Sequence, residues 1–292
     1  MIPIPEIEVK ANQLREDVIK MLVEAGSGHS AGPLGLADIF AALYFRILNH
    51  DPKKPDWPER DRLILSNGHC VPIRYAAMAR SGYFPLKELK TLRKFGSRLQ
   101  GHPERVRLPG LETTSGPLGS GLSAAAGMAL SLKMDGKKGP RIYCVTGDGE
   151  LDEGNIWEAV MFAGKYRLSN LTVIIDRNNI QIDGPTEKVM PLGDLAEKWR
   201  TFGWRTVEID GHNIQSIIDA CNLAKAVEDQ PTAIVARTIP GKGVDYMEYD
   251  YHWHGNPPGT LEPPGAPPKA EQAKIALHEL RTLGGRIRGE HE

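Results

Sequence analysis

Residues 141–179 read RIYCVTGDGELDEGNIWEAVMFAGKYRLSNLTVIIDRNN, and this stretch decides the fold. Apolar runs at 141–145 and 171–175 have the length and composition of buried strands. Residues 156–166, between them, have the apolar period of a helix. Two buried strands joined through a helix predict a parallel pair, because parallel strands need a crossover connection of this kind.

The alternation of strands and helices extends outward on both sides. Apolar strands separated by helices indicate an α/β protein with one parallel sheet covered by helices on both faces. Further strands are predicted at 62–65, 206–209 and 232–238, and helices at 11–24, 35–48, 72–81, 119–134, 195–202 and 214–227. A long loop is expected at 95–114. We expect one domain over 1–256, and then 257–292 as a Pro-rich linker (257–268), a helix (269–283) and a frayed polar end (284–292).

Composition narrows the class of protein. The 292 residues have a net charge of −1, with 40% hydrophobic and 25% charged residues, which is ordinary for a globular protein. This balance gives no reason to expect nucleic acid or a membrane as a partner. The three cysteines have no metal-binding or disulfide spacing, and residues 1–10 do not resemble a signal peptide, so we expect a cytoplasmic location.

Polar loops follow the two strands of the deciding stretch. Gly147-Asp148-Gly149 ends the first strand, and Asn178-Asn179 follows the second. Because one crossover joins the strands, we expect the two loops to lie side by side at one edge of the sheet. A carboxylate and an amide together suit Mg²⁺, and glycines let backbone N–H groups approach a phosphate. Two separate turns are the alternative, since Asp-Gly and Asn-Asn are common turn formers.

Residues 147–184 resemble the diphosphate motif of the thiamine-diphosphate enzymes, and most closely that of the transketolases. The resemblance implies that Asp148, the Asn178 side chain and the Ile180 carbonyl bind a divalent metal ion, Mg²⁺ or in its place Ca²⁺ or Mn²⁺. It implies that Gly147 and Gly149 contact thiamine diphosphate. Glu153 resembles the carboxylate that links the two cofactor sites of the dimer. Alternatively, Glu153 lies in the first turn of a helix, where its negative charge interacts favourably with the helix dipole.

Histidine segments extend the resemblance over roughly residues 11–260. Gly28-His29, Ser66-Asn67-Gly68-His69 and Gly101-His102-Pro103-Glu104 occur in the family's order. The resemblance implies catalytic roles for His29 and His102 and a cofactor contact for His69, and imidazole suits proton transfer near neutral pH. A surface or core histidine is the alternative for each. The segment 113–121, TTSGPLGSG, resembles the family's cofactor loop and implies that Gly116, Pro117 and Leu118 contact the cofactor.

One more histidine is expected in the segment 241–258. His254 matches the family's active-site histidine best, and His252 is the alternative. Ser30 departs from the family pattern, since the familiar full-length enzymes have proline at this place. This departure concerns the details of the loop that follows His29.

The resemblance also implies an activity and a partner. Transketolases move a two-carbon ketol unit from a ketose phosphate to an aldose phosphate, in the pentose phosphate pathway. Their second domain, expected here on another chain, carries the glutamate that acts on the aminopyrimidine ring and most of the residues that hold the sugar phosphate. We therefore expect this chain to work only with a pyrimidine-domain subunit, in an α₂β₂ assembly.

Other functions fit parts of the pattern. A component of a 2-oxo acid dehydrogenase is disfavoured by the histidine series and by Gly-His-Pro-Glu at 101–104. A transketolase for an unusual sugar, such as a branched or sulfonated one, is an alternative, because the residues that recognise the acceptor are expected largely on the partner. A non-catalytic cofactor-binding module is disfavoured because Asp148, Glu153 and Asn178 are all retained, and a fragment of a longer enzyme is a further alternative.

Overall fold

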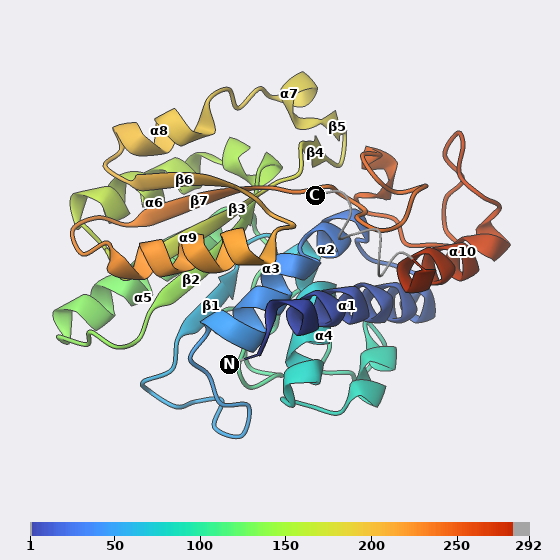
Figure 1. The fold of residues 1–292 in the computed structure, drawn as a ribbon, viewed down its shortest axis with the longest axis horizontal. Coiled ribbons are helices and arrows are strands. Elements are labelled where there is room, and N and C mark those ends of the chain that lie inside the picture. Colours follow the sequence, from blue (N-terminus) through green and yellow to red (C-terminus); the bar gives the residue numbers. More distant parts are fainter. Residues whose placement is uncertain (1, 283–292) are drawn as a thin grey trace.

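The fold is built on a parallel sheet, seen in a computed structural model that describes residues 2–282 (Figure 1). The sheet has the order β1-β2-β3-β7-β6, and every neighbouring pair is parallel. The strands are β1 (Arg62–Leu65), β2 (Ile142–Gly147), β3 (Leu171–Arg177), β6 (Arg205–Asp210) and β7 (Thr232–Arg237). The predicted α/β class and the five predicted strands are confirmed, with bounds that shift by at most a few residues.

Alternate residues of β1, β2, β3 and β7 enter two separate cores, as the two-residue period of a strand requires. In β2, for example, Tyr143 and Val145 face one core, and Ile142 and Cys144 face the other. The second core is covered by α5 (Ser120–Met134), α6 (Gly154–Lys165) and α8 (Leu195–Thr201). The first is covered by α3 (Ala37–Ala42), α4 (Val71–Ser81) and α9 (Ile214–Ala226), with α1 (Ile4–Ala25) packed outside them. Helices therefore lie on both faces, as predicted.

The N-terminal helices differ from the prediction. Helix α1 runs over Ile4–Ala25 and so begins seven residues before the predicted start at 11. Pro5 lies in its first turn, where the missing N–H costs nothing, and Glu6 favours the helix dipole. The single helix predicted at 35–48 is instead α2 (Ala31–Gly35), α3 and a π-helical turn η1 (Leu43–Ile47). This last turn is wide because the N–H of Leu48 donates to the carbonyl of Leu43.

Shorter elements connect the layers. The expected loop at 95–114 contains no helix or strand, and a 3₁₀ helix, η3, precedes it. A small antiparallel hairpin of β4 and β5 follows β3. These elements are η2 (Gly68–Cys70), η3 (Leu86–Thr91), η4 (Gly149–Asp152), β4 (Ile180–Gln181), β5 (Gly184–Pro185), α7 (Thr186–Val189) and η5 (Tyr251–Trp253).

The segment predicted to be a linker packs against the domain. Helix α10 (Lys269–Thr282) lies on α1, and Gln272 within it is fully buried. The Gln272 amide donates to the carbonyls of Leu261 and Pro267, at 2.8 and 2.9 Å, and its oxygen accepts from the N–H of Gly259, at 2.7 Å. These three bonds hold 259–267 in place. The predicted polar end at 284–292 lies outside the described residues.

The carboxyl ends of the five parallel strands lie at one edge of the sheet. Gly147 at the end of β2 pairs with Asp176 of β3, and Arg177 of β3 pairs with Arg237 of β7. The loops after β2 and β3 are therefore neighbours, as predicted from their single crossover. Among residues 2–282, no helix is both long and apolar enough to cross a membrane.

Candidate active site

A cavity of about 280 Å³ lies beyond the carboxyl ends of the strands. Its volume is near the lower end of the range of about 300–1,000 Å³ for small-molecule sites. One end is acidic and amide-rich, and the other end is lined by imidazoles. The predicted site residues that line it are His29, His69, His102, Gly116, Leu118, Gly147, Asp148, Gly149, Asn178, Ile180 and His254.

Asp148 is the centre of the acidic end. Its Oδ1 accepts from the N–H of Gly149 at 2.8 Å, and its Oδ2 accepts from the Arg177 guanidinium at 3.0 Å and the N–H of Asn179 at 2.7 Å. Asn179 has a φ of +63°, a left-handed conformation that asparagine tolerates better than most residues. The Asn-Asn sequence thus lets the chain turn back and offer a backbone N–H to the carboxylate.

Three buried carboxylates gather at this end. Burial raises the pKa of Asp148 to about 6, although Arg177 opposes the shift. Burial also raises the pKa of Asp176 to about 7, and the nearby Asp148 adds to the effect. Glu150 accepts hydrogen bonds from the Ser66 hydroxyl at 2.6 Å and from two backbone N–H groups, and its pKa is raised by burial. Burial therefore opposes the charged form of all three carboxyl groups, and Arg177 offsets this in part at Asp148.

The lone pairs at this end fit a hard cation. Oδ1 of Asp148 accepts one hydrogen bond, and so does the Asn178 side-chain oxygen, which receives the N–H of Ile180 at 3.0 Å. Each oxygen thus keeps a lone pair, and both residues line the cavity together with Ile180. Residues 2–282 contain no group of three His, Cys, Asp or Glu side chains arranged for a metal. A ligand set of one carboxylate, one amide and one carbonyl is compatible with this finding.

Three imidazole rings form the other end. The ring centroids of His29 and His69 are 4.7 Å apart, and His254 lies 5.4 Å from His29 and 5.1 Å from His69. The histidines come from separate elements: His29 precedes α2, His69 lies in η2, and His254 follows η5. Tertiary structure brings together the rings that the sequence separates by as many as 225 positions.

These imidazoles are neutral near pH 7. Burial lowers the pKa of His29 to about 3, aided by the positive charges of His254, Arg93 and His102. Burial lowers the pKa of His254 to about 4 and that of His69 well below its usual range. The buried Nδ1 atoms of His29 and His254 have no hydrogen-bond partner among the described residues. Buried polar atoms are usually paired, so these two nitrogens suit a bound molecule.

Ser30 connects the two loops that carry His29 and His254. Its fully buried hydroxyl lies 3.0 Å from the carbonyl of Trp253 and 2.7 Å from that of Asn256, on either side of His254. A proline at this place would lack both contacts. His252, the alternative to His254, lies outside the cavity and pairs with Asp250 through its Nδ1, at 2.6 Å.

Two predicted site residues do not line the cavity. Pro117 is exposed, and its carbonyl accepts from the Ser120 hydroxyl. Glu153 is exposed at the start of α6, where a carboxylate favours the helix dipole. His102 does line the cavity, and its pKa is lowered by burial and by Arg93.

Several residues in the cavity lining or directly behind it were missed by sequence reasoning. Asp176 and Arg177 end β3 and form the surroundings of Asp148, and Thr238 of the next loop donates to Asp176. Asn67 lines the cavity after β1, and its buried oxygen has no partner among residues 2–282. Asp176 and Asn67 would have been found by treating the polar residues at the carboxyl end of every predicted strand as candidate site residues. No sequence signal pairs Arg177 with Asp148.

A family model described as the thiamine diphosphate binding domain of transketolase matches residues 8–263. The chain belongs to the transketolase family. It is a thiamine-diphosphate-binding transketolase chain and, like its relatives, a transferase. The predicted family and the predicted thiamine diphosphate are thereby confirmed.

Two similar transketolase chains are subunits of nearly this length. The 6-deoxy-6-sulfo-D-fructose transketolase subunit of Clostridium sp. (strain MSTE9) is 46% identical over 243 residues, covering 83% of this chain and 88% of that protein. A subunit of the apulose-4-phosphate transketolase of Phocaeicola vulgatus is 38% identical over 274 residues, covering 94% of this chain and 93% of that protein.

A solved transketolase shares the fold. The structure from Campylobacter jejuni subsp. jejuni superposes with a TM-score of 0.83 at 32% identity, covering 99% of this transketolase chain and 48% of that one. This chain therefore spans about half of that solved transketolase. The doubly covered parallel sheet predicted from sequence is the fold of this family.

Proposed function

We propose that this chain is the diphosphate-binding subunit of a two-chain transketolase and transfers a two-carbon ketol unit from a ketose phosphate to an aldose phosphate. The observation that carries the proposal is one cavity with two chemically different ends. Asp148, Asn178 and Ile180 line one end, and neutral imidazoles line the other. The first end suits a metal diphosphate and the second suits sugar hydroxyls.

The acidic end would hold the cofactor's diphosphate through a divalent cation. Oxygens of Asp148, Asn178 and Ile180 would bind Mg²⁺, and the backbone at Gly147 and Gly149 would lie against the phosphate. When bound, thiamine diphosphate supplies the electron sink for breaking a carbon–carbon bond beside a carbonyl. The protein supplies the orientation and the buried, water-poor surroundings.

The imidazole end would handle protons and hydroxyls. His254 accepts the proton of the donor hydroxyl next to the bond that breaks and returns it when the acceptor aldehyde is joined. A neutral imidazole has the free lone pair that this step needs, which a protonated one lacks. His29 and His102 orient the substrate hydroxyls by hydrogen bonds, and His69 contacts the cofactor.

A second chain would complete the site. Two similar relatives are named as transketolase subunits, which supports a partner for this chain as well. We propose that a pyrimidine-domain subunit supplies the glutamate for the aminopyrimidine ring and joins this chain in an α₂β₂ assembly. The three cysteines of the described residues are buried and free, which supports a reducing, cytoplasmic location and, with the proposed substrates, the pentose phosphate pathway.

A second candidate substrate class is an unusual sugar. The names of the relatives specify 6-deoxy-6-sulfo-D-fructose in one case and apulose 4-phosphate in the other. A sulfonated or branched ketose is therefore an alternative donor for the same site.

The test is ketol transfer from xylulose 5-phosphate to ribose 5-phosphate, with thiamine diphosphate and Mg²⁺. We would assay the chain alone, the candidate partner alone and the mixture. Activity only in the mixture, lost in Asp148→Ala because a metal ligand is removed, is the expected result. Calorimetry measures thiamine diphosphate binding with and without Mg²⁺. This measurement distinguishes a chain that does not bind the cofactor from one that binds it but does not use these sugars. Tight binding of thiamine diphosphate without ketol transfer would favour an unusual sugar as the substrate. No binding of thiamine diphosphate would refute the proposed function.

A further inference from the structure

A second cavity of about 230 Å³ adjoins the candidate active site. His29 lines both cavities, and Gly255 of the second cavity directly follows His254 of the first. The second cavity is lined by Gly26, Ser27, Gly28, His29, Arg93, Gly255, Asn256, Pro257 and Thr260. It is more open than the first and is less crowded with ionisable side chains. Arg93 is the charged residue in its lining.

The structure holds the Arg93 side chain between the two loops that carry His29 and His102. A Cβ atom on Gly101 would lie 2.8 Å from Nε of Arg93, and one on Gly28 would lie 3.7 Å from the same atom. Gly101 therefore leaves space that the guanidinium occupies. The Ser27 hydroxyl lies 3.4 Å from Nη1 of Arg93. Each of these glycines directly precedes an active-site histidine.

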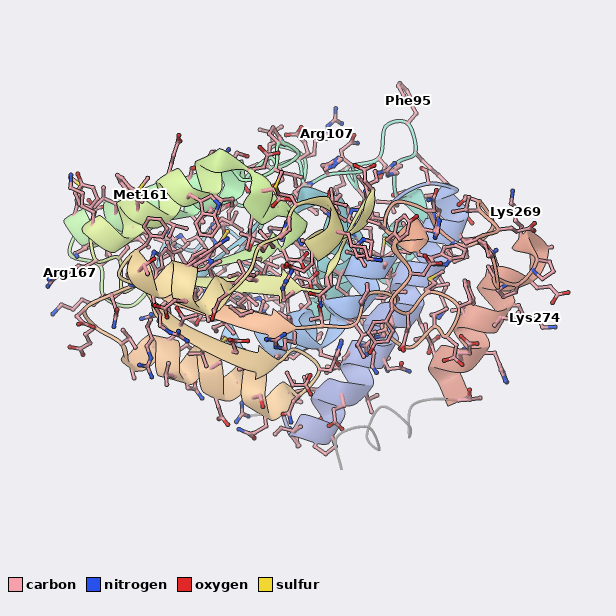
Figure 2. All side chains as sticks on the ribbon, turned by 90° about the horizontal axis from the view of Figure 1, so that it is seen from above. Phe95, Arg107, Met161, Arg167, Lys269 and Lys274 are labelled. Carbon is pink, nitrogen blue, oxygen red and sulfur yellow. The ribbon has the colours of Figure 1, made fainter. Side chains whose placement is uncertain are left out.

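The backbone of Arg93 is also unusual. Its φ of +59° is in the left-handed region, which is unfavourable for an arginine. Its N–H donates to the carbonyl of Leu99, at 2.9 Å, and so fixes the turn. Arg93 lines the second cavity from this turn, whereas Figure 2 shows Phe95, two residues later, projecting from the loop tip.

The charge of Arg93 has no acidic counterpart within residues 2–282. Its neighbours differ in this respect, since Lys94 pairs with Glu24 and Arg98 pairs with Glu88. The guanidinium of Arg93 thus remains free to bind an anion, and its planar fork matches the oxygens of a tetrahedral oxyanion.

We propose that the second cavity is a binding subsite for the anionic end of the sugar, with Arg93 as the specificity-determining residue and Ser27 as a further hydrogen-bond donor. The ligand group is a phosphate monoester or a sulfonate. This inference rests on the proposed function. It adds one anion-binding residue on this chain to the residues that bind the sugar phosphate, most of which the resemblance places on the partner.

The kinetic test compares donors with and without the charged end. Xylulose 5-phosphate and unphosphorylated xylulose are assayed with the reconstituted two-chain enzyme. Arg93→Met, which keeps length but removes charge, should raise the KM for xylulose 5-phosphate about tenfold to a hundredfold, the loss of a charged hydrogen bond. Activity on xylulose should stay within about twofold, because that ketose lacks the group that Arg93 binds. Arg93→Lys should retain part of the preference, and Lys94→Met, a neighbouring exposed cation, should retain all of it.

Binding by the chain alone gives a readout that needs no turnover. Nitrogen-15 NMR spectra are recorded with millimolar inorganic phosphate and, separately, methanesulfonate. The Arg93 Nε–H signal should shift in the wild type. The backbone signals of Ser27 and Gly28 should shift in the wild type and not in Arg93→Met. The anion that causes the larger shifts indicates whether the subsite prefers a phosphate or a sulfonate. This measurement does not depend on ketol transfer from xylulose 5-phosphate.

Several results would overturn the inference. Equal losses with both ketoses would mean that Arg93 only supports the histidine loops. Unchanged kinetics with both ketoses, or no shift with either anion, would mean that its charge does not meet the substrate. Weaker association with the partner subunit, with the ratio of the two KM values unchanged, would assign Arg93 to the interface between the two chains.

Discussion

His254 and His252 lie two residues apart in one loop but have different surroundings. His254 lines the cavity beside His29 and His69, and its Nδ1 has no partner among the described residues. His252 lies outside the cavity, half-exposed, and pairs with Asp250. The contrast provides a matched pair of variants in one short segment.

We expect His254→Asn to lower kcat of the two-chain enzyme by about 10²- to 10⁴-fold, the usual contribution of a positioned acid–base group. His252→Asn, the control, should stay within about twofold because it removes only a half-exposed contact with Asp250. The measurement is steady-state ketol transfer by both variants at several pH values. A larger loss in the His252 variant would contradict the assignment.

At the scale of elements, Gln272 of α10 holds the Pro-rich segment by three hydrogen bonds. Replacing it with leucine would leave two carbonyls and one N–H unpaired beneath the helix. We expect Gln272→Leu to lower the free energy of unfolding by about 2–3 kcal/mol. It should also speed amide hydrogen exchange in 257–268 more than elsewhere.

The control for this prediction is Lys274→Ala on the same helix. Figure 2 shows Lys274 pointing away from the body of the molecule, so its removal should change stability by no more than about 0.5 kcal/mol. Urea unfolding and hydrogen exchange are measured on both variants. If Gln272→Leu changes exchange in 257–268 no more than Lys274→Ala does, the segment is held by other contacts.

At the scale of the whole molecule, a buried charge network joins α1, α3 and the loop after β6. Asp38 of α3 pairs with Arg15 of α1 and accepts from Nδ1 of His212 at 2.8 Å. His212 in turn accepts the N–H of Ile239 at Nε2, at 2.8 Å. The network therefore connects the N-terminal helices to the loop that follows β7, close to the candidate active site.

This network predicts a loss of stability in acid. Burial tends to raise the pKa of Asp38, but Arg15 and His212 outweigh it and lower the pKa to about 2. In the unfolded chain the pKa of the same carboxyl group is about 3.9. Above that pH the stabilisation is fully present. As the pH falls from about 4 to about 2 the unfolded chain gains the proton first, so stability falls by about 2 kcal/mol.

Urea unfolding at pH 7, 4, 3 and 2 measures this dependence. Asp38→Asn should be destabilised at pH 7 by about 3–5 kcal/mol because Arg15 is left buried without its partner. Its stability should then change less between pH 4 and 2 than that of the wild type. Asp219→Asn, on the exposed side of α9, is the control and should follow the wild-type profile. An Asp38→Asn profile parallel to that of the wild type would contradict the prediction.

The sequence by itself determined the class of fold and the position of the site along the chain. Apolar strands alternating with helices can bury both faces only as a covered parallel sheet, and such a sheet gathers its strand ends at one edge. The adjacency of the loops at 147–149 and 178–179 follows from a single crossover between neighbouring strands. These are local patterns, read directly from residue order.

Only the tertiary structure decided which side chains meet. It selects His254 over His252 for the cavity, pairs Arg177 with Asp148, and ties the His29 and His254 loops through Ser30. It also begins α1 seven residues before the predicted start, because Pro5 in a first turn opens a helix although the same residue within a helix would break it. Contacts between distant loops depend on distances and directions that residue order does not carry, since they arise only when the chain has folded around its two cores.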